Sequence, residues 1–380
     1  MLQFVFGRSG YGKTEYIRNR IADKIDRGET QVLLITPEQY SFISEYSLLE
    51  QLGEARAHAV RCLSFSRLCD ECDRLYGADG RKPLTKGGKA ILMKTAIDQV
   101  RPDLELFEKK GSSAAFVQSM TGIYDEMKSC NLSGAAVYAA ADDLDTDILR
   151  CKMRDFSRIM TAYEALLGDS FADPANRLTR LYDQIKDQNY FAGQTVFLDG
   201  FNGFVAQEYK ILERIIAEAK AVYIALDSDS FGTGDGYDLF AYVNETAGIL
   251  QRIADKAGVP TNALQLSENC RTDYADLRRV EQYIFADQAP ETEIPAEHIR
   301  LYAASTVTDA CNDLALQIKG LLRCGYRAGE IAVTMRDREK YAPVLASAFE
   351  KYGVPYYADE RQPVTAQPIL VFPMYLMRSV

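Results

Sequence analysis

Residues 2–16, which read LQFVFGRSGYGKTEY, contain the feature that most constrains the fold of this chain. The segment LQFVF has the composition of a buried strand, and four residues separate Gly7 from the triplet Gly12-Lys13-Thr14. This spacing is typical of a loop whose backbone N–H groups surround phosphate oxygens, while the lysine reaches the terminal phosphates and the threonine hydroxyl helps to hold Mg²⁺. The sequence therefore predicts a phosphate-binding loop between a strand and a helix.

The residues after the loop support this interpretation. Ile17, Ile21 and Ile25 recur at every fourth position, so they share one helix face, and Gly28 stands where a helix ends. The alternative is a glycine-rich turn with a solvated lysine, which the strand–loop–helix context disfavours. The candidate nucleotide-binding residues are Gly7, Arg8, Ser9, Gly10, Tyr11, Gly12, Lys13 and Thr14.

Strand and helix patterns alternate again further along the chain. Apolar segments at 30–39 and 58–68 have strand character, as do those at 194–201 and 221–227. Between the segments 58–68 and 194–201, the apolar residues of 79–189 recur almost everywhere with the period of a helix. The sequence predicts an α/β fold in which residues 1–78 and 190–287 form one parallel-sheet domain, interrupted by a helical subdomain at 79–189.

A second alternation begins near residue 296. The segments IRLYAAS, EIAVTMR and PYYAD are expected to be strands and are separated by two helical patterns, and PILVFPMYLMRSV is expected to be a helix. We expect residues 296–380 to be the beginning of a second α/β domain of the same kind, within which the chain stops.

Composition excludes several classes of function. The net charge of −10 argues against a surface that binds nucleic acid nonspecifically all over, although it leaves room for a local basic track or a basic partner. The two histidines are isolated, and Cys69 and Cys72 form a C-x-x-C without a second pair, so neither a zinc ribbon nor histidine-based catalysis is expected. The chain lacks an apolar run of about 18 residues and a signal peptide, so we expect a cytoplasmic protein without membrane contact.

Several stretches resemble one family of proteins in the order in which the family has them. They are GRSGYGKT (7–14), ITPEQYSF (35–42), LSFSRL (63–68), VFLDGFNGFVAQE (196–208), LSENCRTDYADLRRVEQYIF (266–285) and YGVPYYADERQPVTAQPI (352–369). They are similar to the B subunits of AddAB-type ATP-dependent helicase/deoxyribonucleases, which are relatives of superfamily-1 helicases of the UvrD/Rep type. The resemblance implies a P-loop, RecA-like first domain and the start of a second.

The resemblance also implies partners and cofactors. These are ATP, Mg²⁺, a catalytic helicase-nuclease A subunit in a heterodimer, single-stranded DNA and double-strand DNA ends that are processed for recombinational repair. It leaves open a role in recognising a recombination hotspot sequence. Members of the family are much longer and end in a nuclease domain with an iron–sulfur cluster. This chain has neither, so we expect an N-terminal fragment or a naturally shortened relative without that cluster.

Parts of the motor are missing. Active relatives resemble DEFQD at the second motif, where the Asp holds Mg²⁺ and the Glu activates water. Here DGFNG keeps Asp199 but has Gly200 and Asn202 in the Glu and Gln positions. Loss of such a base removes roughly 10²–10⁴-fold of rate. The γ-phosphate-sensing Gln has no counterpart at 225–243, and only six residues precede Gly7, where relatives read adenine. We therefore expect little or no motor activity.

Two further residues match positions that contact phosphate or metal in the family. Arg271 in ENCRTD matches an arginine that stabilises charge on the transferred phosphate, and the alternative is a capping or ion-paired arginine near a helix start. Asp199, together with Thr14, is expected to contact Mg²⁺, and the alternative is a carboxylate bonded to loop amides.

The family would place single-stranded DNA over the loops after the second and third strands. In this chain those loops carry the candidate DNA-binding residues Gln39, Tyr40, Ser64, Phe65 and Arg67. Each of them also fits a core or capping role, and for Phe65 a core position is favoured.

Three functions remain open from the sequence. The first is a helicase-like subunit that binds nucleotide and single-stranded DNA with little motor activity of its own. The second is an active ATP-driven translocase. The third is a P-loop small-molecule kinase, which the second α/β unit and the order of the matching stretches disfavour.

Overall fold

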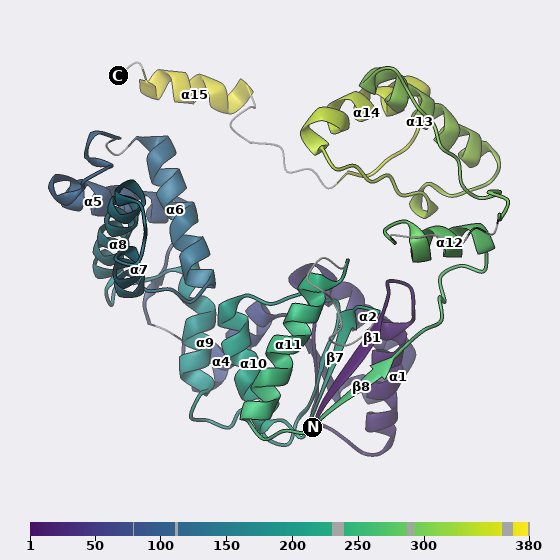
Figure 1. The fold of residues 1–380 in the computed structure, drawn as a ribbon, viewed down its shortest axis with the longest axis horizontal. Helices are drawn as coiled ribbons and strands as arrows, with labels where there is room; N and C mark the ends of the chain where they lie inside the picture. The colour runs from purple at the N-terminus through teal and green to yellow at the C-terminus, as the bar shows by residue number, and fades with distance from the viewer. Residues whose placement is uncertain are drawn as a thin grey trace. The chain divides into compact units, whose positions relative to one another are not determined.

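The computed structural model describes residues 1–78, 80–110, 113–229, 239–286, 291, 293–358 and 368–378. The chain divides into two compact units, Met1–Pro290 and Glu291–Val380, and each is described by itself (Figure 1). None of the helices in these described ranges is both long enough and apolar enough to cross a membrane.

A six-stranded sheet with only parallel pairings forms the centre of the first unit, in the order β3-β2-β6-β7-β1-β8. The predicted α/β class with a parallel sheet is confirmed. Because all strands run the same way, their carboxyl ends meet at one edge, where ligands of such folds bind. The strands are β1 (Leu2–Gly7), β2 (Val32–Ile35), β3 (Val60–Leu63), β6 (Thr195–Leu198), β7 (Ala221–Asp227) and β8 (Thr261–Gln265).

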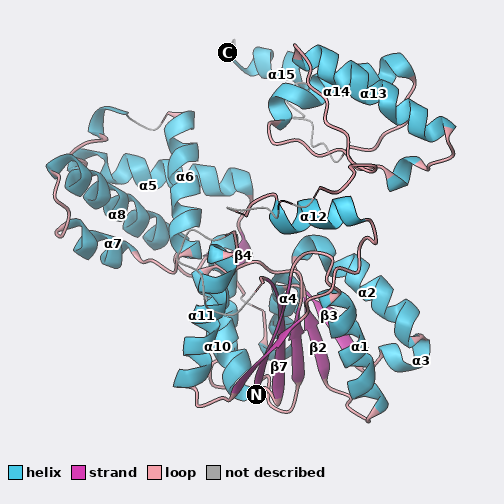
Figure 2. Ribbon diagram, turned by 45° about the vertical axis from the view of Figure 1, so that its right-hand side comes forward, coloured by secondary structure: helices cyan, strands magenta, loops and turns pink. Residues whose placement is uncertain are grey.

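Helices cover both faces of this sheet, which lies between them in Figure 2. The strands are apolar on both sides: along β1, Phe4 and Phe6 belong to one core cluster and Val5 to the other. The first cluster is closed by α4, α10 and α11, and the second by α1 and α2. The helices of this unit outside 79–189 are α1 (Lys13–Asp26), α2 (Glu38–Leu52), α3 (Glu54–Ala57), α4 (Phe65–Tyr76), α10 (Ala206–Glu218), α11 (Ala241–Lys256) and α12 (Ala275–Tyr283).

Between α4 and β6 the chain is mostly helical and has a core of its own, centred on Met93, Tyr124, Phe156 and Tyr163. This part also contains a two-residue parallel pair, β4 (Lys82–Pro83) with β5 (Phe171–Ala172). The helices are α5 (Lys86–Val100), α6 (Ala114–Ser129), α7 (Gly134–Ala141), α8 (Asp147–Leu167) and α9 (Arg177–Ile185), with 3-10 turns at Arg101–Asp103, Glu108–Lys110 and Pro174–Asn176.

The second unit differs from the sequence-based expectation. Its helices α13 (Val307–Arg323) and α14 (Arg338–Tyr352) pack through a small apolar core, with a 3-10 turn at Ala328–Glu330 and a further helix α15 (Pro368–Arg378). The described residues of the three expected strands, 299–305, 330–336 and 355–358, form no strand, and Asp359 lies outside the described residues. A strand is defined by its hydrogen-bonded neighbour, and among the described residues of these segments no such pairing is present.

Candidate nucleotide-binding site

The loop between β1 and α1 has the backbone geometry that its glycines suggest. Gly10 and Gly12 have φ angles of +89° and +80°, in the left-handed region that side chains disfavour. A Cβ atom at Gly10 would also lie 3.0 Å from the Cβ of Arg271. Both conformation and space therefore require glycine at Gly10.

Lys13, the first residue of α1, lies almost buried over the loop. Its Nζ donates to the backbone oxygens of Gly7 and Arg8, each at 2.8 Å, and forms an ion pair with Asp227 at the end of β7. The register Gly7↔Asp227 between β1 and β7 brings this carboxylate to the loop. The lysine charge is thus held at the carboxyl edge of the sheet.

Asp199 follows β6, the strand between β2 and β7, and its exposed fraction is 8%. Burial raises the pKa of its carboxyl, while hydrogen bonds from the Thr14 hydroxyl and the Gly200 N–H and the charge of Lys13 act in the opposite direction. The structure therefore brings Asp199 and Thr14, the two candidate Mg²⁺ ligands, into direct contact. A buried carboxylate with a raised pKa gains from a cation nearby.

Arg271 reaches the same place from the segment after β8. The backbone N–H of Cys270 donates to the oxygen of Gly10 at 2.9 Å, and the Asn269 side chain accepts from the N–H of Arg271 at 2.8 Å. These bonds fix the backbone of Arg271 against the loop, and its side chain packs on Gly10.

A cavity of about 650 Å³ joins these groups at the carboxyl edge of the sheet. It is lined by residues of the loop and α1, by Asp199 and Asp227 and by Arg271. Gly200 and Asn202 also line it. The cavity therefore brings together loop amides, the three cationic side chains of Lys13, Arg18 and Arg271, and the donor pair Thr14 and Asp199, which together suit a polyphosphate.

Gly200 has a structural reason to be glycine. Its φ is +81°, and a Cβ there would lie 3.4 Å from Cδ of Pro37 and 3.6 Å from the ring of Tyr40. The left-handed backbone disfavours any side chain at this position.

Metal binding would depend on the nucleotide as well as on the protein. Across the described ranges, no group of three or more His, Cys, Asp or Glu side chains is arranged to hold a metal ion. Mg²⁺ at phosphate-binding sites takes one or two protein oxygens and completes its shell with phosphate oxygens and water. The Thr14 hydroxyl and the Asp199 carboxylate fit that donor set.

The candidate DNA-binding residues fall into two groups. Gln39 and Tyr40 are exposed in the first turn of α2, and Tyr40 also lines the cavity. Ser64 and Phe65 are buried: the Ser64 side chain accepts from the N–H of Arg67 as the N-cap of α4, and Phe65 packs against Phe201 and Phe204. The structure gives Ser64 and Phe65 the capping and core roles that the sequence left open.

Arg67 lies partly buried between α4 and α2. Its Nη1 donates to Oγ of Ser41 at 3.0 Å and contacts the carboxylate of Glu45 at 2.9 Å. These contacts join the two helices, so the guanidinium is engaged within the protein.

Some contacts at the site were missed by sequence reasoning. Asp227 ends the apolar segment AVYIALD, and an acidic residue at the end of a strand in a parallel sheet is the signal that could have found it. The contacts of Arg8 with Asp229 and Glu281 join residues more than 200 positions apart. No local pattern indicates such a contact. Residues 230–238, part of the 225–243 segment where a phosphate sensor would stand, lie outside the described residues.

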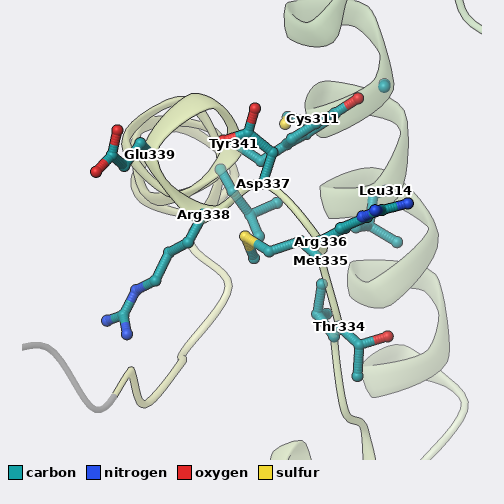
Figure 3. Close-up of a pocket in the computed structure, with 12 residues that line it drawn as sticks. Cys311, Leu314, Thr334, Met335, Arg336, Asp337, Arg338, Glu339 and Tyr341 are labelled. Atoms are coloured by element: carbon teal, nitrogen blue, oxygen red, sulfur yellow. The ribbon is translucent and has the colours of Figure 1, made fainter. Parts of the chain in front are cut away.

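A second cavity of about 830 Å³ lies in the other unit, between α13, α14 and the segment 333–337. Cys311 and Leu314 line the cavity from α13. Figure 3 shows that Arg338 and Glu339 point away from these two residues. None of the candidate site residues from the sequence lines this cavity.

Comparison with known proteins identifies the family. The family model described as "ADDB, N-terminal" matches residues 4–281, which include the loop, Asp199 and Arg271. The chain belongs to the AddB family. The resemblance inferred from the sequence motifs is thereby confirmed.

Three curated relatives are named as the B subunit of an ATP-dependent helicase/deoxyribonuclease. Those of Clostridium botulinum (strain Langeland) and Clostridioides difficile (strain 630) are each 28% identical over 97% of this chain. That of Thermoanaerobacter sp. (strain X514) is 25% identical over 98% of it. In each case the match covers 33% of the relative, so this AddB-family chain spans about a third of the length of these proteins.

Proposed function

We propose that this chain is the nucleotide-binding, helicase-like part of a B-type subunit in an ATP-dependent helicase/deoxyribonuclease. It binds ATP with Mg²⁺ and contacts single-stranded DNA, next to a helicase-nuclease A subunit, while cytoplasmic double-strand DNA ends are processed for recombinational repair. Its first unit has a P-loop, RecA-like fold, and its own motor activity is little or none. One observation carries the proposal: residues 9–14 of the phosphate loop, except Tyr11, line a single cavity together with Asp199 and Arg271, and Gly200 stands there where a motor needs a carboxylate.

Binding is supported by the charges around the cavity. Lys13 and Arg271 line it, and Lys13 already bonds two backbone oxygens and Asp227. Phosphate oxygens offer the lysine stronger, charged acceptors than the two backbone oxygens. The helix α1 begins at Lys13, so its N-terminal N–H groups and dipole add to the attraction for phosphate.

Hydrolysis requires an aligned water as well as bound phosphate. Gly200 has no side chain to accept a proton from water, and its backbone conformation disfavours one. Asn202 is an amide and is not a general base at neutral pH. We therefore expect slow turnover at most.

The runner-up function is an active translocase, which Arg271 favours. Its side chain lies in the cavity where it could stabilise charge on the transferred phosphate. A different group, from the partner or from a longer form of the chain, would then have to position the water.

Calorimetric titration with ATP and Mg²⁺, paired with a DNA-stimulated turnover assay, separates the two functions. We would compare the chain with Lys13→Ala and with the control Lys94→Ala, which removes an exposed lysine paired with Asp98 on α5. The proposal expects binding in the chain and in Lys94→Ala, loss of binding in Lys13→Ala, and negligible turnover in all three.

Two results would overturn the proposal. Turnover in the range of ordinary enzymes, about 1–10³ s⁻¹, that disappears in Lys13→Ala would identify a translocase. Equal nucleotide binding by Lys13→Ala and the unchanged chain would show that the loop is not the phosphate site.

A further inference from the structure

A cluster on the outer side of the phosphate loop is not used by the proposed chemistry. It consists of Arg8, Tyr11, Asp229 and Glu281, and we call it the Arg8 latch. Arg8 and Tyr11 are loop residues, Asp229 follows β7, and Glu281 lies on α12. None of the four lines the nucleotide cavity.

Arg8 contacts side chains and backbone of three other segments, although it is partly exposed. Its guanidinium pairs with both carboxylate oxygens of Asp229, and its Nη1 donates to the backbone oxygen of Glu281 at 2.9 Å. Nη1 also lies 3.3 Å from Oε1 of Glu281 and 3.3 Å from the backbone oxygen of Gln282. The ring of Phe240 covers the guanidinium at 5.6 Å. Bidentate pairing with a planar guanidinium fixes direction as well as distance.

A second loop residue holds the same glutamate. The Tyr11 hydroxyl donates to Oε2 of Glu281 at 3.1 Å, so the two carboxylate oxygens of Glu281 contact two different residues of the phosphate loop. The segment before α12 is joined to the loop as well, by the bond from the Cys270 N–H to the Gly10 oxygen. The loop is therefore connected to α12 through Arg8 and Tyr11, and to the segment before α12 through Gly10.

We propose that Glu281 is a positioning residue for the phosphate loop, so that nucleotide binding and the docked position of α12 are energetically coupled. The inference rests on the proposed nucleotide binding and adds a regulatory element to that site. The latch lies outside the cavity, so it acts on the shape of the loop and not by occupying the phosphate position. A docked α12 keeps the loop in its binding conformation, and bound phosphates in turn keep α12 docked, since coupling between two sites is reciprocal.

Three variants test the coupling in the full 380-residue chain. Glu281→Gln removes the charge and weakens the pairing with Arg8, Tyr11→Phe removes one bond, and Arg8→Gln removes the centre of the latch. The control is Asp273→Asn, because Asp273 pairs with Arg278 within the same segment at 2.8 Å and has no described contact with the loop. The readouts are calorimetric affinity for AMP-PNP with Mg²⁺ and hydrogen–deuterium exchange of residues 275–283.

We expect Glu281→Gln to weaken AMP-PNP binding about 5-fold, at the low end of allosteric couplings, and Tyr11→Phe to weaken it less. The double variant of Arg8→Gln with Glu281→Gln should bind no more weakly than Arg8→Gln alone. AMP-PNP should slow exchange in 275–283 of the unchanged chain and of Asp273→Asn, but not of Glu281→Gln. A residue with a merely structural role would not make α12 respond to nucleotide.

The inference and the proposed function fail in different ways. If the unchanged chain binds AMP-PNP, but exchange in α12 does not respond and Glu281→Gln binds equally well, the coupling is overturned. If the unchanged chain does not bind AMP-PNP, the proposed function and the coupling both fail. Ligand-free exchange in Glu281→Gln and Tyr11→Phe then still shows whether the latch holds α12 to the loop. Should Glu281→Gln not fold, Tyr11→Phe gives the deciding comparison.

Discussion

At the scale of single residues, the nucleotide site is an arrangement of opposed charges in a partly buried place. Lys13 is close to two carboxylates, Asp227 and Asp199, and the ion pair to Asp227 leaves Asp199 with hydrogen bonds from Thr14 and Gly200. The effect of burial on the pKa of Asp199 is larger than that of these hydrogen bonds and of the Lys13 charge, so the pKa of this carboxyl is raised. A buried carboxylate charge lowers the stability of the folded state but binds a cation well, and such a combination is typical of a functional position.

The first residue-scale prediction concerns Asp199→Asn. The folded pKa of Asp199 is raised, so its favourable contribution to folding exists at low pH and is lost as pH rises through that pKa. Removing the charge should therefore raise the thermal midpoint of the ligand-free chain at pH 7 by about 1–3 °C and have little effect at pH 3. The same variant should lose the Mg²⁺-dependent part of nucleotide affinity. Calorimetry with and without Mg²⁺ checks this, and a lower thermal midpoint at pH 7 would contradict the argument.

The second residue-scale prediction concerns Gly200→Glu, which restores the acidic residue of active motors. The left-handed backbone at Gly200 should make the variant about 1–2 kcal/mol less stable without creating DNA-stimulated turnover. Gly200→Ala isolates the backbone strain and should destabilise similarly. Urea denaturation and a turnover assay measure both effects. Turnover in Gly200→Glu but not in Gly200→Ala would show that a carboxylate can act from this position.

At the scale of elements, the ends of two strands and the start of one helix place three of the functional side chains. Asp199 follows β6 and Asp227 ends β7, whose registers with β2 and β1 bring both to the carboxyl edge of the sheet. Lys13 begins α1, and Ser64 caps α4. The site is therefore a property of parallel strands ending together, and the loop supplies only part of it.

An element-scale prediction separates the capping and DNA-contact roles of Ser64. Its side chain accepts from the N–H of Arg67 at 3.2 Å and is almost fully buried. Ser64→Ala should lower the free energy of unfolding by about 0.5–2 kcal/mol, as loss of an N-cap does, without changing affinity for an oligothymidylate. Chemical denaturation and fluorescence anisotropy measure the two quantities. Unchanged stability with weaker DNA binding would assign Ser64 to the DNA interface.

At the scale of the whole molecule, charge limits what the chain can do alone. The net charge is −10, and Arg67, the one charged residue among the candidate DNA residues, is paired with Glu45. Few phosphates can be neutralised by such a surface, so a partner would have to supply most of the contacts. The chain also spans about a third of the length of the curated relatives that it matches.

The whole-molecule prediction is weak, salt-sensitive binding of single-stranded DNA. We expect the affinity of the chain for a labelled oligothymidylate, measured by fluorescence anisotropy, to fall by most of its value between about 50 and 200 mM salt. The reason is that the binding free energy comes mainly from the release of a few counterions. Submicromolar affinity at physiological salt would contradict the prediction and would indicate a stronger interface on this chain than the described residues show.

The sequence alone was sufficient for features that depend on local chemistry. The loop at 7–14 follows from glycine spacing, the helix after it from the repeat of Ile17, Ile21 and Ile25, and the parallel sheet from apolar strands that alternate with helices. Asp199 could be named because it ends an apolar strand and matches a family motif. Such patterns involve residues that are close in the sequence. They predict the structure correctly because each residue type, at that spacing, favours one local conformation or role.

Only the tertiary structure decided which of these residues meet and which are already engaged. It placed Phe65 in the core and made Ser64 the buried N-cap of α4, and it joined Arg8 and Tyr11 to Glu281, some 270 positions away. It also left the expected strands of the second unit as segments without strand pairing. One reason accounts for all of these differences. Burial, ion pairing and sheet pairing depend on residues that are distant in the sequence but close in space, and a local sequence pattern does not show which residues those are.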